Sequence, residues 1–132
     1  MSARYAIYYA PGAEEALHAR ASAWLGRDAI TGEALARPGI ADLSDLDLDA
    51  LTADPRHYGF HATLKAPFEL AVEKTEGDLL DAFHAFAAGE PPFSAEIAPQ
   101  GLSAFIAFRL TGPSPAMQAL HEGCVRAFEP YR

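Results

Sequence analysis

The sequence contains a single cysteine, Cys124, so no disulfide can form within these 132 residues and nothing indicates an oxidising compartment. It also lacks an excess of positive charge, because 10 Lys and Arg are set against 18 Asp and Glu, for a formal net charge of −8. Long nucleic acids are bound through basic stripes, so we do not expect them as partners. No apolar run is long enough to cross a bilayer and no leader-like pattern opens the chain. We therefore expect no membrane partner and a cytoplasmic location.

The remaining composition is that of an ordinary soluble globular protein, with 50% hydrophobic and 21% charged residues. No repeat, low-complexity tract or linker interrupts it, so we expect residues 1–132 to form one domain. Hydrophobic periodicity, caps and turn residues predict an α+β fold in which an antiparallel sheet is layered with helices. The predicted strands are 4–10, 58–66, 93–98 and 102–110, and the predicted helices are 13–25, a short one near 43–52, 76–88 and 114–128.

The run from Arg56 to Phe68 is the most informative part of the sequence. Side chains alternate between the faces of a strand, so His61, Thr63 and Lys65 are expected to project together from one side. Phe60, Ala62 and Leu64 are then expected to point into the core. A proton-transfer group, a hydroxyl and a positive charge on one ridge suit a site that holds a phosphate.

The motif His61-Ala62-Thr63-Leu64 resembles the H-x-T-x signature of the 2H phosphoesterases. The stretches 4–9, 24–28 and 58–68 are similar to one branch of that superfamily, an uncharacterised, DUF1045-like group labelled as phosphonate-metabolism proteins. The resemblance implies a fold of two pseudo-symmetric lobes around a cleft, of which this chain would supply one. The family carries two H-x-[ST] motifs and this chain has only the first.

The resemblance also implies a function: hydrolysis or opening of a cyclic or otherwise small phosphodiester, with no metal and no cofactor. The hydrolase would use His61 as general acid or base and the Thr63 hydroxyl as a phosphate ligand, and its partner would be a small phosphate ester. The structural alternative is a buried histidine bonded to backbone beside a threonine chosen for β-propensity.

Three further residues are candidates for substrate binding. Lys65 could balance phosphate charge, or could be a solvated lysine at a strand end. Tyr8 could line the cleft, or could be a packed sheet tyrosine. Arg56 could clamp an anion through two hydrogen bonds, or could simply be exposed before the strand.

Two metal sites are considered and set aside. His57 and His61 have the spacing of a zinc-binding pair, but that pair needs a helix and a Glu after the first histidine, and Tyr58 follows instead. The acidic run from Asp45 resembles a calcium loop, but Ala50 stands where that loop needs glycine and Arg56 where it needs glutamate.

Two rival interpretations stay open. The chain could be a non-catalytic module that binds a phosphorylated small molecule, or an inactive, truncated half of the enzyme. A truncated half would expose apolar surface and would be prone to form a homodimer.

Overall fold

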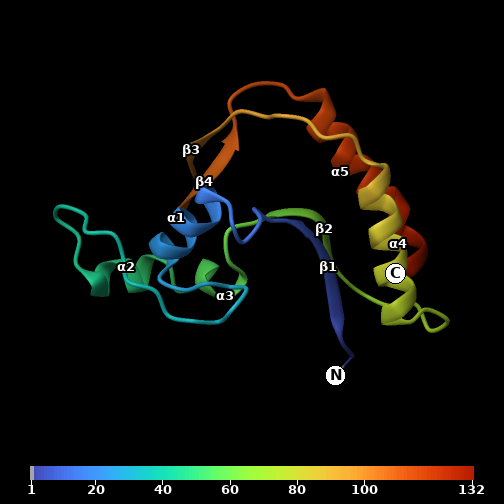
Figure 1. Cartoon of the computed structure of the whole chain (residues 1–132), viewed down its shortest axis with the longest axis horizontal. Helices are drawn as coiled ribbons and strands as arrows, with labels where there is room; N and C mark the ends of the chain where they lie inside the picture. Colours follow the sequence, from blue (N-terminus) through green and yellow to red (C-terminus); the bar gives the residue numbers. More distant parts are fainter. Residues whose placement is uncertain (1) are drawn as a thin grey trace. The chain divides into compact units, whose positions relative to one another are not determined.

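A computed structural model describes residues 2–132 and confirms the α+β fold class (Figure 1). The four strands form two separate two-stranded sheets, β1 with β2 and β3 with β4. The 2H relationship receives no confirmation from this fold. In chain order the elements are β1 (Arg4–Tyr9), α1 (Ala16–Leu25), α2 (Asp45–Leu51), α3 (Pro55–Tyr58), β2 (Ala62–Glu69), α4 (Glu76–Gly89), β3 (Ile97–Leu102), β4 (Phe105–Leu110), α5 (Pro115–Phe128) and the 3-10 turn η1 (Glu129–Tyr131).

The chain divides into two compact units, each described by itself below. The first, called the 64–132 unit, takes residues 2–7 together with Leu64–Arg132. The second, called the 8–63 unit, takes Tyr8–Thr63. The expectation of one domain for residues 1–132 stays a prediction. Among residues 2–132, no helix is both long enough and apolar enough to span a membrane.

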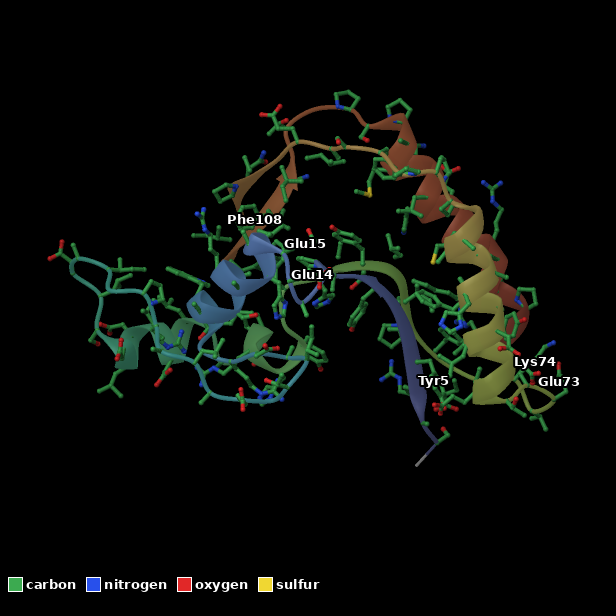
Figure 2. The ribbon with its side chains drawn as sticks, in the orientation of Figure 1. Tyr5, Glu14, Glu15, Glu73, Lys74 and Phe108 are labelled. Carbon is green, nitrogen blue, oxygen red and sulfur yellow. The ribbon has the colours of Figure 1, made fainter. Side chains whose placement is uncertain are left out.

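The core of the 64–132 unit is a cluster of buried apolar side chains from β1, β2, α4 and α5. Phe128 on α5 is fully buried, and its ring meets those of Phe83 and Phe86 on α4 at centroid distances of 6.5 and 5.5 Å. Tyr5, labelled in Figure 2, donates its hydroxyl hydrogen to Glu76 Oε2 at 2.9 Å and so links β1 to α4. The buried residues of this cluster are Ile7, Leu64, Phe68, Leu79, Cys124 and Phe128.

Helix α4 begins at Glu76, the start that the sequence predicts. Thr75 is the N-cap: its side chain accepts a hydrogen bond from the Asp78 backbone N–H, and the Asp78 carboxylate accepts one from the Thr75 backbone N–H. This reciprocal capping box satisfies two donors that an uncapped helix leaves unpaired. The same arrangement starts α2, with Ser44 and Asp47 in the corresponding places.

The 8–63 unit has few buried apolar side chains, and a polar network around Arg37 ties it together. The Arg37 side chain is only 6% exposed and its guanidinium donates to the Asp49 carboxylate, the Thr52 hydroxyl and the Trp24 carbonyl. Helix α1 ends at Gly26, whose φ of +76° is the left-handed conformation that favours glycine. This network therefore joins the end of α1 to α2 within the unit.

The strand that carries the motif differs from its prediction. We expected a strand over 58–66, but β2 begins at Ala62 and continues through Pro67 to Glu69. The residues before it form the short helix α3, which Pro55 opens in a tolerated first-turn position and Gly59 closes. Ala62 is exposed, and Leu64 and Lys65 are both buried, so the expected strict alternation of faces fails in this strand.

Candidate functional site

The candidate site of the 8–63 unit is centred on His61, a half-buried histidine just before β2. Its ring is stacked on the ring of Tyr8, with centroids 4.0 Å apart and planes inclined by 25°. The Tyr58 ring is also near His61, with its centroid 6.3 Å away and its plane tilted by 54°. Two tyrosine rings therefore limit the orientations that this imidazole can adopt.

A backbone hydrogen bond fixes which nitrogen of His61 carries hydrogen. Nδ1 lies 2.9 Å from the carbonyl oxygen of Gly59. A carbonyl only accepts hydrogen bonds, so Nδ1 must be the donor, and in the neutral ring Nε2 then carries the lone pair. Nε2 can accept a hydrogen bond from a hydroxyl when the ring is neutral, and can donate one to a phosphate oxygen when it is protonated.

The position of Gly59 depends on its being glycine. Its φ is +75°, and a Cβ at this position would lie 2.6 Å from the Cβ of Ala29. Any other residue would meet both the backbone penalty and this clash. Arg27 holds the same segment by donating to the carbonyl oxygens of Arg56 and His57, both at 3.4 Å. The residues around α3 thus set the carbonyl that orients His61.

Thr63 is exposed near the start of β2, two residues after His61. Its role as a phosphate ligand stays a prediction, as does the role of His61 in proton transfer.

Arg56 belongs to the polar network of the 8–63 unit. Its Nη2 donates to the Asp49 carbonyl at 2.7 Å and to the Thr52 hydroxyl at 3.2 Å, and it lies 3.3 Å from the Asp49 carboxylate. Its Nε is buried and has no hydrogen-bond partner among residues 2–132. The guanidinium is thus mostly engaged in holding α2, and its proposed anion clamp stays a prediction.

Lys65 does not stand on an exposed ridge. It is 6% exposed, and its ammonium donates to Glu129 Oε2 at 2.7 Å and to the Val125 carbonyl at 3.3 Å, all within the 64–132 unit. The hydrogen bond from Lys65 lowers the pKa of the Glu129 carboxyl. The expected alternation that would place Lys65 on one ridge with His61 and Thr63 is therefore wrong, because Lys65 is buried and its ammonium bonds to Glu129, 64 residues away. The role of Lys65 in substrate binding stays a prediction.

Sequence reasoning placed Tyr8 near the motif but missed Tyr58 and the Gly59 carbonyl as direct neighbours of the histidine. The glycine two residues before His61 was the available signal, since glycine readily adopts the positive φ that is found there. Among residues 2–132, no group of three or more His, Cys, Asp or Glu side chains could hold a metal ion.

Comparison with known proteins gives one family and two curated relatives. The family described as "Protein of unknown function (DUF1045)" matches residues 63–132. The "Ribose 1,5-bisphosphate phosphokinase PhnN" of Janthinobacterium sp. (strain Marseille) is 36% identical over 127 residues, which are 96% of this chain and 28% of the relative. The protein of the same name from Laribacter hongkongensis (strain HLHK9) is 38% identical over 106 residues, 80% of this chain and 25% of the relative. No solved structure matches.

These relatives overturn the expected reaction. The sequence predicted a hydrolase that cleaves a phosphodiester, whereas both relatives are named as phosphokinases, enzymes that transfer a phosphoryl group. The phosphoesterase prediction is therefore wrong. This chain spans about a quarter of the length of the relatives that it matches.

Proposed function

The chain belongs to the family of proteins of unknown function DUF1045, and on that premise we propose that it is a ligand-binding segment of a phosphokinase system, where it binds a phosphorylated ribose. The names of the two relatives support the ligand class. Their length supports the idea of a segment, because the matched region is only part of each kinase. The sequence of this chain has no G-x-x-x-x-G-K-[ST] loop for nucleotide phosphates, which favours a binding role over phosphoryl transfer by these residues alone.

The observation that carries the proposal is the fixed tautomer of His61. With Nδ1 committed to the Gly59 carbonyl at 2.9 Å, Nε2 is left for the ligand. A phosphorylated ribose offers both kinds of partner that Nε2 can use, a hydroxyl donor and a phosphate acceptor. Thr63 adds a hydroxyl that can donate to a phosphate oxygen, and the stacked Tyr8 ring keeps the imidazole from turning away.

We extend the proposal to the metabolic pathway, the cellular location and the evolutionary origin of the motif. Phosphonate metabolism is the pathway, on the strength of the resemblance in the sequence, and the cytoplasm is the location, where the lone thiol stays reduced. The His61-Ala62-Thr63 motif descends from the H-x-[ST] strand of the 2H superfamily and is used here for binding. A second such strand in an experimental structure of a longer homologue would support this descent.

Calorimetry with ribose 1,5-bisphosphate tests the function. We expect saturable binding by the native chain and a loss of affinity of about tenfold or more in His61→Ala, because a hydrogen bond to a charged phosphate is removed. Thr63→Val keeps the shape of the side chain and removes only the hydroxyl, so its smaller loss reports that one bond.

The matched control is His121→Ala, which removes an exposed histidine from α5. Its affinity should equal that of the native chain. Absence of binding by the native chain, or equal losses in His61→Ala and His121→Ala, would show the proposal to be wrong.

A further inference from the structure

The residues from Arg27 to Ala34 form a closed turn within the 8–63 unit. Arg27 and Ala34 pair with each other in an isolated antiparallel bridge. Between them, the Asp28 backbone N–H donates to the Glu33 carbonyl at 2.9 Å, and the Gly32 backbone N–H donates to the Asp28 carbonyl at 2.7 Å. The two ends of the segment are thus joined, and we call it the Arg27–Ala34 turn.

The Asp28 side chain stabilises this turn from within. Its carboxylate accepts hydrogen bonds from the backbone N–H groups of Ile30 at 2.8 Å and Thr31 at 3.3 Å. The bond from Ile30 is the main reason that the pKa of Asp28 is lowered. The same carboxylate lies 3.4 Å from Nε2 of His18 on α1. An aspartate that bonds to the backbone just ahead of it is typical of a defined turn, so this segment has a fixed shape.

Two residues of the turn contact the segment that precedes His61. Arg27 Nη1 donates to the carbonyl oxygens of Arg56 and His57 on α3, both at 3.4 Å. The last carbonyls of a helix have no partner within the helix, so Arg27 supplies one to each of these two. The backbone of Gly59 lies against Ala29, because a Cβ on Gly59 would be 2.6 Å from the Ala29 Cβ.

We propose that Arg27 is a positioning residue of the candidate site, which acts on ligand binding through His61. The Gly59 carbonyl accepts from His61 Nδ1 at 2.9 Å, and this bond selects the tautomer in which Nε2 has the lone pair. Arg27 holds the two carbonyls that come shortly before Gly59 and so fixes where the Gly59 carbonyl lies. Without Arg27 that carbonyl moves more freely, and the imidazole adopts the other tautomer, whose Nε2 carries the hydrogen.

A direct contact with the ligand is the competing role for Arg27, because a guanidinium can bind phosphate itself. However, its Nη1 is engaged by two backbone carbonyls, and its Nη2 lies beside Gly32, 3.7 Å from where a Cβ would be. This geometry favours positioning over ligand contact. The expected effect on affinity rests on the proposed function, whereas the effect on the His61 tautomer does not, so either can fail without the other.

Nuclear magnetic resonance of the imidazole nitrogens tests the positioning role. Proton–nitrogen correlation spectra distinguish a ring nitrogen that carries hydrogen from one that does not, at about pH 9, where imidazole side chains in general are neutral. The His61 signals are those that disappear in His61→Gln. We expect hydrogen on Nδ1 in the native chain. In Arg27→Met, which keeps a long apolar stem without donors, the tautomer with hydrogen on Nε2 should become the larger share.

The matched control is Arg20→Met, which changes an exposed arginine on α1 and should leave the His61 spectrum native. Arg27→Lys should give a tautomer mixture between those of the native chain and Arg27→Met. Its ammonium can donate to either carbonyl, but its side chain is shorter than that of arginine. A native spectrum in Arg27→Met, or equal changes in Arg27→Met and Arg20→Met, would overturn the proposal. So would a native chain in which His61 carries hydrogen on Nε2.

Hydrogen exchange of α2 distinguishes positioning from a general loss of structure. Arg37 holds this helix, so its amides should exchange in Arg27→Met as they do in the native chain. Faster exchange of α2 would mean that the 8–63 unit had opened, and Arg27→Lys would then decide. A mixture of tautomers with native exchange in Arg27→Lys supports the proposal. A native spectrum, or the same opening of α2, would overturn it.

A double-mutant cycle measures the effect on the ligand. In calorimetry with ribose 1,5-bisphosphate, Arg27→Met should weaken binding by about fivefold, the equivalent of about one hydrogen bond. In a His61→Ala background the same substitution should have nearly no effect, because Arg27 acts through the imidazole. Equal losses in both backgrounds would show that Arg27 contacts the ligand directly and would overturn the proposal. Absence of binding by the native chain would contradict the proposed function, and the tautomer spectra would then decide this inference.

Discussion

The two compact units are stabilised by different kinds of interaction. Six buried apolar residues form the core of the 64–132 unit, with aromatic rings in contact around Phe128. In the 8–63 unit Leu25 and Leu48 are buried, together with Ser22 and Thr52, and the Arg37 guanidinium is almost fully enclosed. One unit relies on area removed from water and the other on directed hydrogen bonds. The candidate site around His61 belongs to the unit that depends on hydrogen bonds.

The largest expected effect is on the apolar core. Replacing Phe128 with Ala should lower the free energy of unfolding by about 3–5 kcal/mol, because the substitution removes a fully buried ring and leaves a cavity. Chemical denaturation monitored by circular dichroism measures the change. The control is Val72→Ala, at a fully exposed position, which should shift stability by less than about 0.5 kcal/mol. Similar losses in the two variants would contradict the account of this core.

A smaller effect is expected in the polar network. Replacing Arg37 with Ala should cost about 2 kcal/mol, since the guanidinium bonds to Asp49, Thr52 and the Trp24 carbonyl are all lost. Hydrogen exchange should show faster opening of α2, with the amides of α4 unaffected. Arg37→Lys keeps the charge without the planar fork and should recover only part of the loss.

Arg20 provides the control for Arg37, because it is an exposed arginine on α1. Arg20→Ala should leave the exchange rates of α2 unchanged. If Arg37→Ala left α2 as protected as Arg20→Ala does, the network would not be what holds this unit.

The smallest effect is a loss of helix capping in acid, and it should occur in both units. Hydrogen bonds from Ser44 and Thr75 lower the pKa values of Asp47 and Asp78, respectively. A carboxyl whose folded pKa is lowered contributes its stability above the unfolded pKa, near 4, and loses it as the pH falls through the folded value. Hydrogen exchange of the first turns of α2 and α4, followed downward from about pH 5, measures the change.

Single substitutions distinguish the acid response of α2 from that of α4. Asp47→Asn should remove the acid response of α2 only, and Asp78→Asn that of α4 only. An unchanged response in either variant would mean that another group is responsible.

Local sequence signals were enough to predict α4. Its prediction of 76–88 differs by one residue from the observed Glu76–Gly89, because the Thr75 and Asp78 capping box defines the start within four neighbouring residues. The start of β2 was missed by four residues for the opposite reason. Pro55 and the positive φ of Gly59 form α3 in front of it. The close approach of Gly59 to Ala29, which leaves no room for a Cβ, joins positions distant in the sequence, so no local pattern shows it.

The candidate site was predictable in type more than in arrangement. His61 and Thr63 could be chosen from their spacing, and Tyr8 from its place in a strand. The burial of Lys65 could not be predicted from the sequence, because its partner Glu129 lies 64 residues away and belongs to a different element. The network of Arg37 was missed as well, because its partners Asp49, Trp24 and Thr52 lie 12, 13 and 15 residues away. The hydrophobic pattern in that part of the chain is also weak.

Gly26 and Arg37 have a consequence for how this sequence can vary. A Cβ on residue 26 would lie 2.8 Å from Cζ of Arg37, and the backbone there has a positive φ. Hydrogen bonds hold the guanidinium in the space that the missing side chain leaves, so a side chain at position 26 and the arginine at position 37 exclude each other. We expect homologues that lose the glycine to lose the arginine as well, so that covariation between positions 26 and 37 would trace this contact through the family.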